Sequence, residues 1–499
     1  MNILNPATWF ARRRPAGAVS VRSFAAADVS RILGPWTFDG GFSNDEVCAA
    51  LATMRARSRD MYKNSAHHRR YINLVANNLV GTGFKFKSLP TDGYPGEKNA
   101  RPDRMAAQRI QYHWWRWCST PAYCDSTGRK TVAQIDRLCA KNLARDGEYF
   151  IIVDRFEPTE RNPYGVSLRV IRPDACDERF RGTLENGNIV RGGVELDART
   201  LAPVAYYLFT RREYSTTTGE RGPLVRVPAA SVIHGYTQED EDQTRGVPMG
   251  HSVLKKLKMI DEYDQAELVA ARDEACSVST YEAPLGRDDE IVDLTDPQDA
   301  EAVAACAALT MPKEPGQAEV LPQGWRRTVS TPQHPNREVT AYKNGLLRDV
   351  ATGYLIEYAC FANDWAGVSY SSVRQGTIAE RDMWMVLQDD FIAQCKTPVF
   401  LRWLDAFLLS DVSGGLPYEK RQKFADHVFR GRRWTWVDPL KDIRAAEIAV
   451  QHGWKTDSQI AEDYDADFDD NLEEVRRTDA LKKGTSLEVK PNEKTSATA

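Results

Sequence analysis

Cysteine is sparse in this sequence of 499 residues, and no two cysteines stand in a C-x-x-C pair. The nine cysteines are Cys48, Cys118, Cys124, Cys139, Cys176, Cys276, Cys306, Cys360 and Cys395. An odd and dispersed set fits reduced thiols in a cytosol. No ligands cluster at the spacing that a structural zinc ion needs, so the sequence predicts no metal site.

Long hydrophobic runs and an excess of basic residues are also missing. No apolar run approaches the roughly 20 residues that span a bilayer. The first residues, MNILNPATWFARRRPAGA, contain no apolar segment of a signal peptide. A net charge of −4 and a pI of about 6.1 exclude a generally basic nucleic-acid coat. The hydrophobic content of 42% and charged content of 27% are ordinary for a soluble globular protein, and the length predicts two or more substructures.

The motifs of the common phosphate, zinc and calcium sites are absent. The fragment nearest to a G-x-x-x-x-G-K-[ST] loop, 128–131, lacks the rest of the phosphate cradle. Neither H-E-x-x-H nor a calcium-binding loop occurs. The adjacent histidines, His67 and His68, point in different directions if they lie on a helix. These absences predict no catalytic residues, no cofactor and no metal.

The stretch GVSYSSVRQG, residues 367–376, only begins like the nucleophile motif G-x-S-x-G, because Ser371 occupies the fifth position. A loop between two helices is also the wrong context, since that motif needs a strand, a turn and a helix. We therefore interpret the hydroxyls of Ser369 and Ser371 as helix caps, and Ser371 or Ser372 can cap the helix that follows.

Helical patterns dominate the first part of the chain after a loop-rich arm, 1–42. Ser43 and Glu46 have capping-box spacing, and a helix is predicted through Leu51 and Met54. A second helix is predicted from about His67 to Leu79, ended by glycine. Six basic residues concentrate here: Arg55, Arg57, Arg59, Lys63, Arg69 and Arg70. They favour a solvated helix face or a subunit contact, with nucleic-acid contact as the alternative.

Short β-rich runs follow from residue 147, separated by turns such as Asn186-Gly187. Two helices are then predicted, at 250–275 and 338–358. Between them, 282–301 carries eight acidic residues and one basic residue, which indicates a small protruding module.

The C-terminal region could be drawn as a helix-turn-helix with Gly453 at the turn. Between Asp438 and Asp479, however, thirteen acidic residues oppose five basic ones. Such a surface would repel DNA phosphates, so packing between helices is the better interpretation.

Several stretches together resemble the lambda-type portal proteins of tailed bacteriophages. The strongest similarity is HPNREVTAYKNGLLRDVATGYLIEY…GVSYSSVRQG, residues 334–376, with a His-Pro-Asn opening, paired leucines before an arginine, and a Tyr-Ser-Ser-x-Arg stretch. Further similar stretches are LVANNLVGTGFKFKS, GEYFIIVDR, VIHGYTQEDEDQTRGVPMGHSVL and WVDPLKDIRAA, in family order along almost the whole chain.

This resemblance implies an α+β, mainly helical portal fold with wing, stem, clip and crown regions, assembled as a ring around a central channel. The regions it implies are an N-terminal arm at 1–42, a wing with a β-rich part at 43–249, a first stem helix at 250–275, a clip at 276–337, a second stem helix at 338–358, a tunnel loop at 359–370, a long helix and wing return at 371–437, crown helices at 438–480 and a flexible tail at 481–499.

The implied function is that of the head-tail connector at the unique capsid vertex of the virion, assembled in the host cytoplasm. Double-stranded DNA of any sequence would pass through a dodecameric ring during packaging and ejection. The implied partners are terminase, which would hydrolyse ATP, the major capsid protein, scaffold and head-tail adaptors, with no membrane. The alternatives are a nucleic-acid-processing enzyme of the phage and a structural capsid or tail component without a DNA channel.

The residues implied to contact DNA lie in the tunnel loop and the stem. In the loop they are Asn363, Asp364, Trp365, Gly367, Ser369 and Tyr370, and in the channel or stem they are Lys343 and Arg348. Either Trp365 packs into a neighbouring subunit, or the loop moves on Gly367 and touches the DNA backbone. On the second alternative, deletion of 361–367 would spare ring assembly and impair packaging.

Overall fold

The structure, a computed structural model, describes residues 43–93, 101–209, 222–275, 280–282, 326–328, 338–434, 439–464, 466 and 468–483. The predicted N-terminal arm lies outside these residues, as does most of the predicted clip and tail. The described chain is a mixture of helices and antiparallel sheets, which confirms the predicted fold class. No helix among these residues is long and apolar enough to cross a bilayer.

Five helices form the N-terminal part: α1 (Ser43–Asn64), α2 (Ala66–Leu79), α3 (Arg104–Ser119), α4 (Pro121–Cys124) and α5 (Val132–Asp146). The two predicted N-terminal helices are thereby confirmed. Gly81 takes a φ of 57° just beyond α2, in the left-handed region where glycine ends a helix at little cost. Thr131 and Gln134 form a reciprocal capping box at the start of α5.

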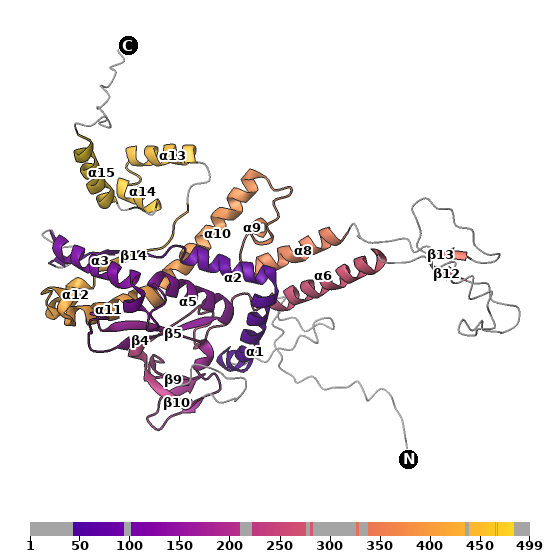
Figure 1. The fold of residues 1–499 in the computed structure, drawn as a ribbon, viewed down its shortest axis with the longest axis horizontal. Coiled ribbons are helices and arrows are strands. Elements are labelled where there is room, and N and C mark those ends of the chain that lie inside the picture. The colour runs from indigo at the N-terminus through magenta and orange to yellow at the C-terminus, as the bar shows by residue number, and fades with distance from the viewer. Residues whose placement is uncertain are drawn as a thin grey trace, which may run out of the picture.

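The β-rich region forms two antiparallel sheets below the helices (Figure 1). One has the order β11-β4-β5, built from β4 (Glu148–Arg155), β5 (Val166–Ile171) and β11 (Val232–Tyr236). The other has the order β10-β9-β8-β7-β6, built from β6 (Gly182–Thr183), β7 (Ile189–Arg191), β8 (Val194–Leu196), β9 (Pro203–Phe209) and β10 (Leu224–Pro228). Successive residues of β4 face opposite sides, so Ile151 packs in the main core and Phe150 in a second core between the sheets.

Two further pairings have two strands each, and the first of them joins segments far apart in the chain. β1 (Lys85–Ser88) pairs with β14 (His427–Arg430), and β2 (Thr91–Asp92) pairs with β3 (Arg101–Pro102). Short 3₁₀ helices lie at η3 (Pro173–Ala175), η4 (Ala229–Ser231), η6 (Asp411–Ser413) and η7 (Tyr418–Lys420).

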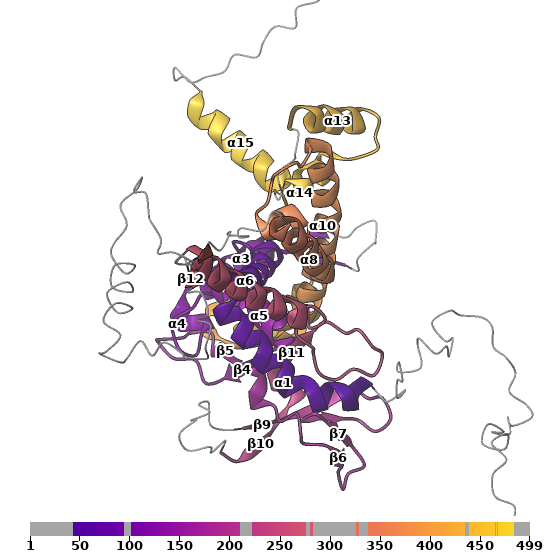
Figure 2. The same ribbon diagram turned by 90° about the vertical axis from the view of Figure 1, so that its right-hand side faces the viewer.

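A helical hairpin of α6 (Leu254–Ala275) and α8 (Val339–Gly353) projects from the body (Figure 1) and points toward the viewer in Figure 2. At its far end β12 (Thr280–Glu282) pairs with β13 (Arg326–Thr328). The predicted bounds of both helices were too wide. Gly250 has a φ of 75° and the chain turns before α6 begins at Leu254, while α8 ends at Gly353 rather than at 358.

After the hairpin come α9 (Tyr358–Ala362) and a nearly continuous helical rod. The rod consists of α10 (Tyr370–Phe391), a π-helical turn (Ile392–Lys396) and α11 (Thr397–Leu409), and α12 (Arg421–Phe424) follows it. Three further helices, α13 (Pro439–Gln451), α14 (Asp457–Asp463) and α15 (Phe468–Lys482), lie beside the body in Figure 1. Gly453 has a φ of 70° and turns the chain between α13 and α14, as predicted.

Buried charges hold this body together. Glu148 at the start of β4 is fully buried and bonds Arg55 of α1, Arg245 and His234 of β11. Burial alone would raise the pKa of Glu148, but the charges of Arg245 and Arg55 outweigh it and hold the pKa well below its usual value. The carboxylate therefore joins α1, the sheet and the segment before α6.

Candidate nucleic-acid interface

The predicted tunnel loop, 359–370, is partly helical. Its first four residues belong to α9, and the irregular segment is 363–369. The helix forms here because the Glu357 carboxylate accepts a hydrogen bond of 2.9 Å from the amide of Cys360 at the helix start. The amide of Glu357 in turn donates to the Glu380 carboxylate of α10 at 3.0 Å.

Phe361 anchors α9 to the body and was missed from the sequence. Its ring is fully buried, 5.4 Å from the ring of His67 and 5.6 Å from that of Tyr354. Arg70 of α2 adds a hydrogen bond of 2.9 Å to the carbonyl of Cys360. The capping position of Glu357 is the one local signal that could have indicated this helix.

Asn363 and Asp364 shape the turn that follows. Asn363 adopts a φ of 57° at the end of α9, in the left-handed region that asparagine tolerates better than most residues. The Asp364 carboxylate accepts from the hydroxyl of Tyr358 at 2.9 Å and from the amide of Ala366 at 3.1 Å. Both side-chain oxygens of Asp364 thus stabilise the turn.

Trp365 and Gly367 form the exposed tip. The side chain of Trp365 is 53% exposed, although it is large and apolar. Gly367 has a φ of 70°, and an added Cβ there would meet open space. The tip is therefore available to a second molecule, and both alternatives for Trp365 stay open.

Ser369, rather than Ser371 or Ser372, caps α10. Its hydroxyl oxygen accepts from the amide of Ser372 at 3.3 Å, and Tyr370 is the first helical residue. Capping by Ser369, one of the serines predicted as caps, is confirmed, whereas Ser371 and Ser372 lie inside the helix, because three closely spaced serines carry the same local signal. A capping hydroxyl bonded to neighbouring serines is consistent with a structural role.

Lys343 and Arg348, the predicted channel cations, contact neighbouring helices. Lys343 of α8 forms an ion pair with Asp264 of α6. The guanidinium of Arg348 lies 5.0 Å from the centre of the Tyr358 ring. These contacts join α8 to α6 and to α9.

Of the six basic residues of the N-terminal helices, Arg55 and Arg59 are paired inside the body, whereas Arg57, Lys63 and Arg69 are exposed. Arg55 is fully buried against Glu148, and Arg59 bonds Asp146 and Asp174. These two arginines therefore form neither a solvated helix face nor a nucleic-acid contact. The sequence pattern could not indicate this, because it does not reveal a carboxylate far away in the chain.

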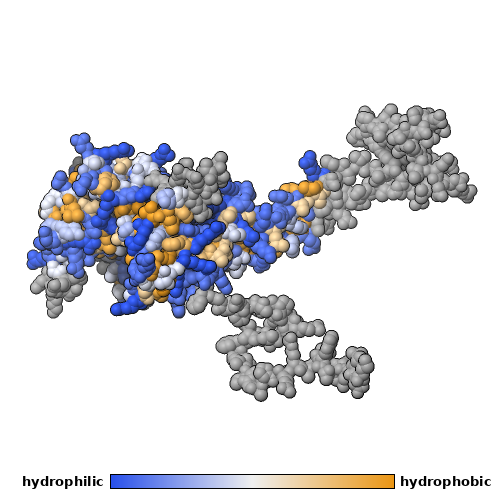
Figure 3. Space-filling model, turned by 90° about the horizontal axis from the view of Figure 1, so that it is seen from below, coloured by the Kyte–Doolittle hydropathy of each residue, from blue (hydrophilic) through white to orange (hydrophobic). Residues whose placement is uncertain are grey.

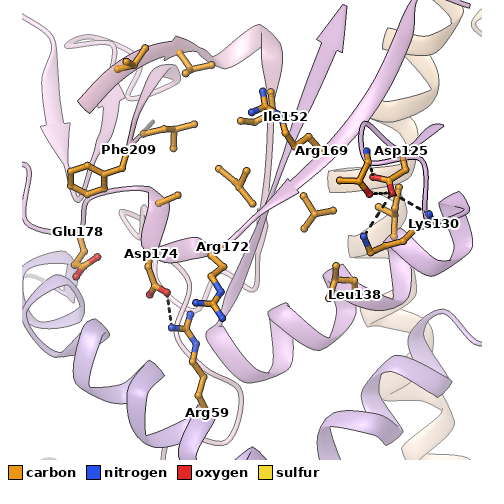
Figure 4. Close-up of a pocket in the computed structure, with 18 of the residues that line it drawn as sticks. Arg59, Asp125, Lys130, Leu138, Ile152, Arg169, Arg172, Asp174, Glu178 and Phe209 are labelled. Atoms are coloured by element: carbon orange, nitrogen blue, oxygen red, sulfur yellow. Dashed lines mark hydrogen bonds and ion pairs between the residues drawn. The ribbon is translucent and has the colours of Figure 1, made fainter. Parts of the chain in front are cut away.

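A groove of about 720 Å³ lies between α1, α5 and the edge strands β5 and β10 (Figure 4). At one end the Asp125 carboxylate accepts hydrogen bonds from the amides of Thr127, Arg129 and Lys130, at 3.0 to 3.3 Å. The fragment 128–131 therefore surrounds a carboxylate of its own chain, where a phosphate-binding loop would hold its nucleotide.

Comparison with known proteins places the chain in a family. The family model of the phage portal protein, lambda family, matches residues 30–388. A probable portal protein of Halomonas phage phiHAP-1 is 29% identical over 473 residues, covering 93% of this chain and 87% of that protein. Portal protein B of Escherichia phage lambda is 23% identical over 458 residues, covering 86% and 84%.

Two solved structures are also similar. The neck of a native gene transfer agent particle computed with C12 symmetry has a TM-score of 0.45 at 11% identity, covering 86% of this chain and 97% of that one. A HK97 family phage portal protein from Corynebacterium diphtheriae has a TM-score of 0.28 at 13% identity, covering 65% and 84%. Because the family model spans more than half of the sequence, the chain belongs to the lambda family of phage portal proteins.

Proposed function

We propose that copies of this chain form a closed ring, dodecameric as the resemblance implies, at the unique vertex of a capsid. Double-stranded DNA of any sequence would pass through its channel during packaging and ejection. The observation that carries this proposal is the family match over residues 30–388.

The α6–α8 hairpin supports assembly through its surface. Leu268, Val269 and Tyr342 are 71%, 67% and 58% exposed, and hydrophobic surface is visible on the projecting hairpin in Figure 3. Apolar side chains in such a position favour burial against another copy. A ring closes when one face of each copy meets a different face of the next.

On this proposal the hairpin is the stem, β12 and β13 begin the clip, and α13–α15 form the crown. Terminase and later the head-tail adaptors would dock at the clip, and the major capsid protein and scaffold would contact the wing. Assembly would take place in the host cytoplasm, and the ring would remain in the virion. The ring itself would have no catalytic activity, with ATP hydrolysis left to terminase.

Native mass spectrometry and single-particle images of the purified protein test the ring. We expect a single closed oligomer with an open central channel. A stable monomer that hydrolyses ATP or cuts DNA would support the enzyme alternative instead, and a closed particle without a channel would support a purely structural component.

A further inference from the structure

Two arginines meet at one tryptophan between α10 and the segment after β14. Arg381 lies on α10, and Arg432 and Trp434 follow β14. The guanidinium carbon of each arginine is 6.0 Å from the centre of the Trp434 ring. The ring attracts each cation, but the arrangement also brings two like charges close together.

The position of this cluster is fixed by hydrogen bonds to α2. Arg432 Nη1 donates to the carbonyl of Asn77 at 2.9 Å, and Trp434 Nε1 donates to the side-chain oxygen of Asn78 at 3.3 Å. Gln388 of α10 donates to the carbonyl of Arg432 at 3.1 Å. The Arg432 guanidinium thereby stabilises the carbonyl end of α2, which accounts for the position of its Nη1. This contact does not account for the position of Arg381.

The charge of Arg381 is poorly compensated. Its Nε is buried and has no hydrogen-bond partner, and among the described residues neither Arg381 nor Arg432 forms an ion pair. Burial and then the charge of Arg432 lower the pKa of Arg381, while the charge of Glu380 opposes them. The Glu380 carboxylate already accepts from Trp384 Nε1 and from the amide of Glu357.

Arg381 lies on the helix that follows the loop described above. Arg381 stands eleven residues into α10, so it lies about 16 Å along the helix from Tyr370. In Figure 1, α10 and α9 lie on the side of the body that also faces α13 and α14. Lys343 is paired with the Asp264 carboxylate, whereas Arg381 and Arg432 form no ion pair among the described residues and can therefore accept an anion.

We propose that Arg381 and Arg432 form a binding site for a phosphate group of the DNA backbone, with Trp434 holding the guanidiniums in place. Two planar guanidiniums match the several oxygens and the charge of a phosphate. The contact would be independent of sequence, because the site offers nothing to base edges. The inference rests on the proposed DNA channel, and a ring would repeat the pair as a narrow basic band at one level.

Titration of the purified full-length protein with a labelled DNA duplex, followed by fluorescence anisotropy at several salt concentrations, tests the site. Arg381→Ala should weaken binding roughly tenfold at low salt and flatten the dependence on salt, equally for duplexes of any sequence. Arg381→Lys should retain part of the affinity because it keeps the charge. Arg169→Ala is the matched control, since Arg169 is partly exposed and paired with Asp154, and it should bind like the wild type.

Arg381→Ala removes no hydrogen bond among the described residues, and an unchanged melting temperature would verify that the fold is intact. Wild-type affinity and salt dependence in this variant would overturn the site while leaving the channel intact. A ring structure in which a carboxylate of a neighbouring copy bonds Arg381 would also overturn it. If the wild-type protein forms no ring, that result counts against the proposed function. The same DNA titration of the unassembled wild type and Arg381→Ala then shows whether the phosphate site exists.

Discussion

His68 of α2 and Tyr354, just after α8, are joined by a hydrogen bond of 2.7 Å between the imidazole Nδ1 and the phenol oxygen, across 286 positions of the chain. The second imidazole nitrogen of His68 bonds the hydroxyl of Ser58 at 3.1 Å, and the Tyr354 ring stacks on Tyr71 at 3.9 Å. This buried contact fixes the end of the projecting hairpin against the body, directly before the segment that leads to the exposed loop.

Tyr354→Phe should destabilise the protein by about 1–3 kcal/mol, because it leaves a buried nitrogen of His68 without its partner while the ring stacking remains. Urea denaturation measures the change. Tyr342→Phe is the matched control, since the Tyr342 side chain is 58% exposed, and it should have nearly no effect. Equal effects of the two variants would contradict the role of the hydrogen bond.

Stability should fall with decreasing pH through His68. Burial lowers the pKa of His68 from its ordinary 6.5 to about 4, so between these values the unfolded chain binds a proton that the folded chain does not. The free energy of unfolding should therefore decrease, through this group alone, by up to about 1.4 kcal/mol per pH unit as the pH falls from 6.5 towards 4. Other groups titrate in this range, so wild type and His68→Gln are compared by denaturation at each pH. The slope should be shallower in the variant, and parallel curves would disprove the prediction.

Glu148→Ala should cost about 3–5 kcal/mol, because it leaves the buried charges of Arg55 and Arg245 without their carboxylate. We expect a large loss of soluble protein and an earlier unfolding transition. Glu157→Ala provides the control, since Glu157 is exposed on the loop after β4. A wild-type transition in Glu148→Ala would show that the ion cluster does not stabilise the body.

Leu355 has a strained backbone conformation, and a substitution can relieve this strain. It has a φ of 57°, although its side chain is 69% exposed and contributes little packing. A left-handed conformation costs roughly 1–2 kcal/mol for most residues and less for asparagine. Leu355→Asn should therefore raise the melting temperature, and Leu355→Val should lower it. The opposite order would mean that the local conformation is not the one described.

Substitutions of Trp365 and Phe361 distinguish a functional role of the loop from a structural one. Trp365→Ala should change stability by less than about 0.5 kcal/mol, because the side chain is half-exposed. It should lower DNA packaging or retention in a complementation assay. Phe361→Ala should instead cost about 3–5 kcal/mol, because its ring is fully buried.

For that reason the deletion of 361–367 predicted from the sequence is too wide. It would remove a core side chain together with the loop and confuse the two effects. Normal packaging by a stable Trp365→Ala variant would exclude a function for Trp365 in passing DNA. Failure of this variant to form rings would show that Trp365 packs into a neighbouring subunit.

The sequence by itself determined the family and most of the helices and strands. Gly81 and Gly453 end helices, Asn186-Gly187 turns the chain between strands, and the period changes to two after residue 147. Each of these signals lies within a few neighbouring residues, because backbone conformation and side-chain periodicity are local properties.

Only the tertiary structure decided where the hairpin helix ends and which charges are free. The apolar spacing of Val350, Tyr354 and Tyr358 continues without a break, yet the helix stops at Gly353, and the partners of Tyr354, His68 and Tyr71, lie on α2. Arg55 has the sequence context of a surface residue but is buried against Glu148, whereas Arg381 lies beside Arg432 and forms no ion pair among the described residues. Burial and ion pairing depend on residues far apart along the chain, so neither can be read from a local pattern.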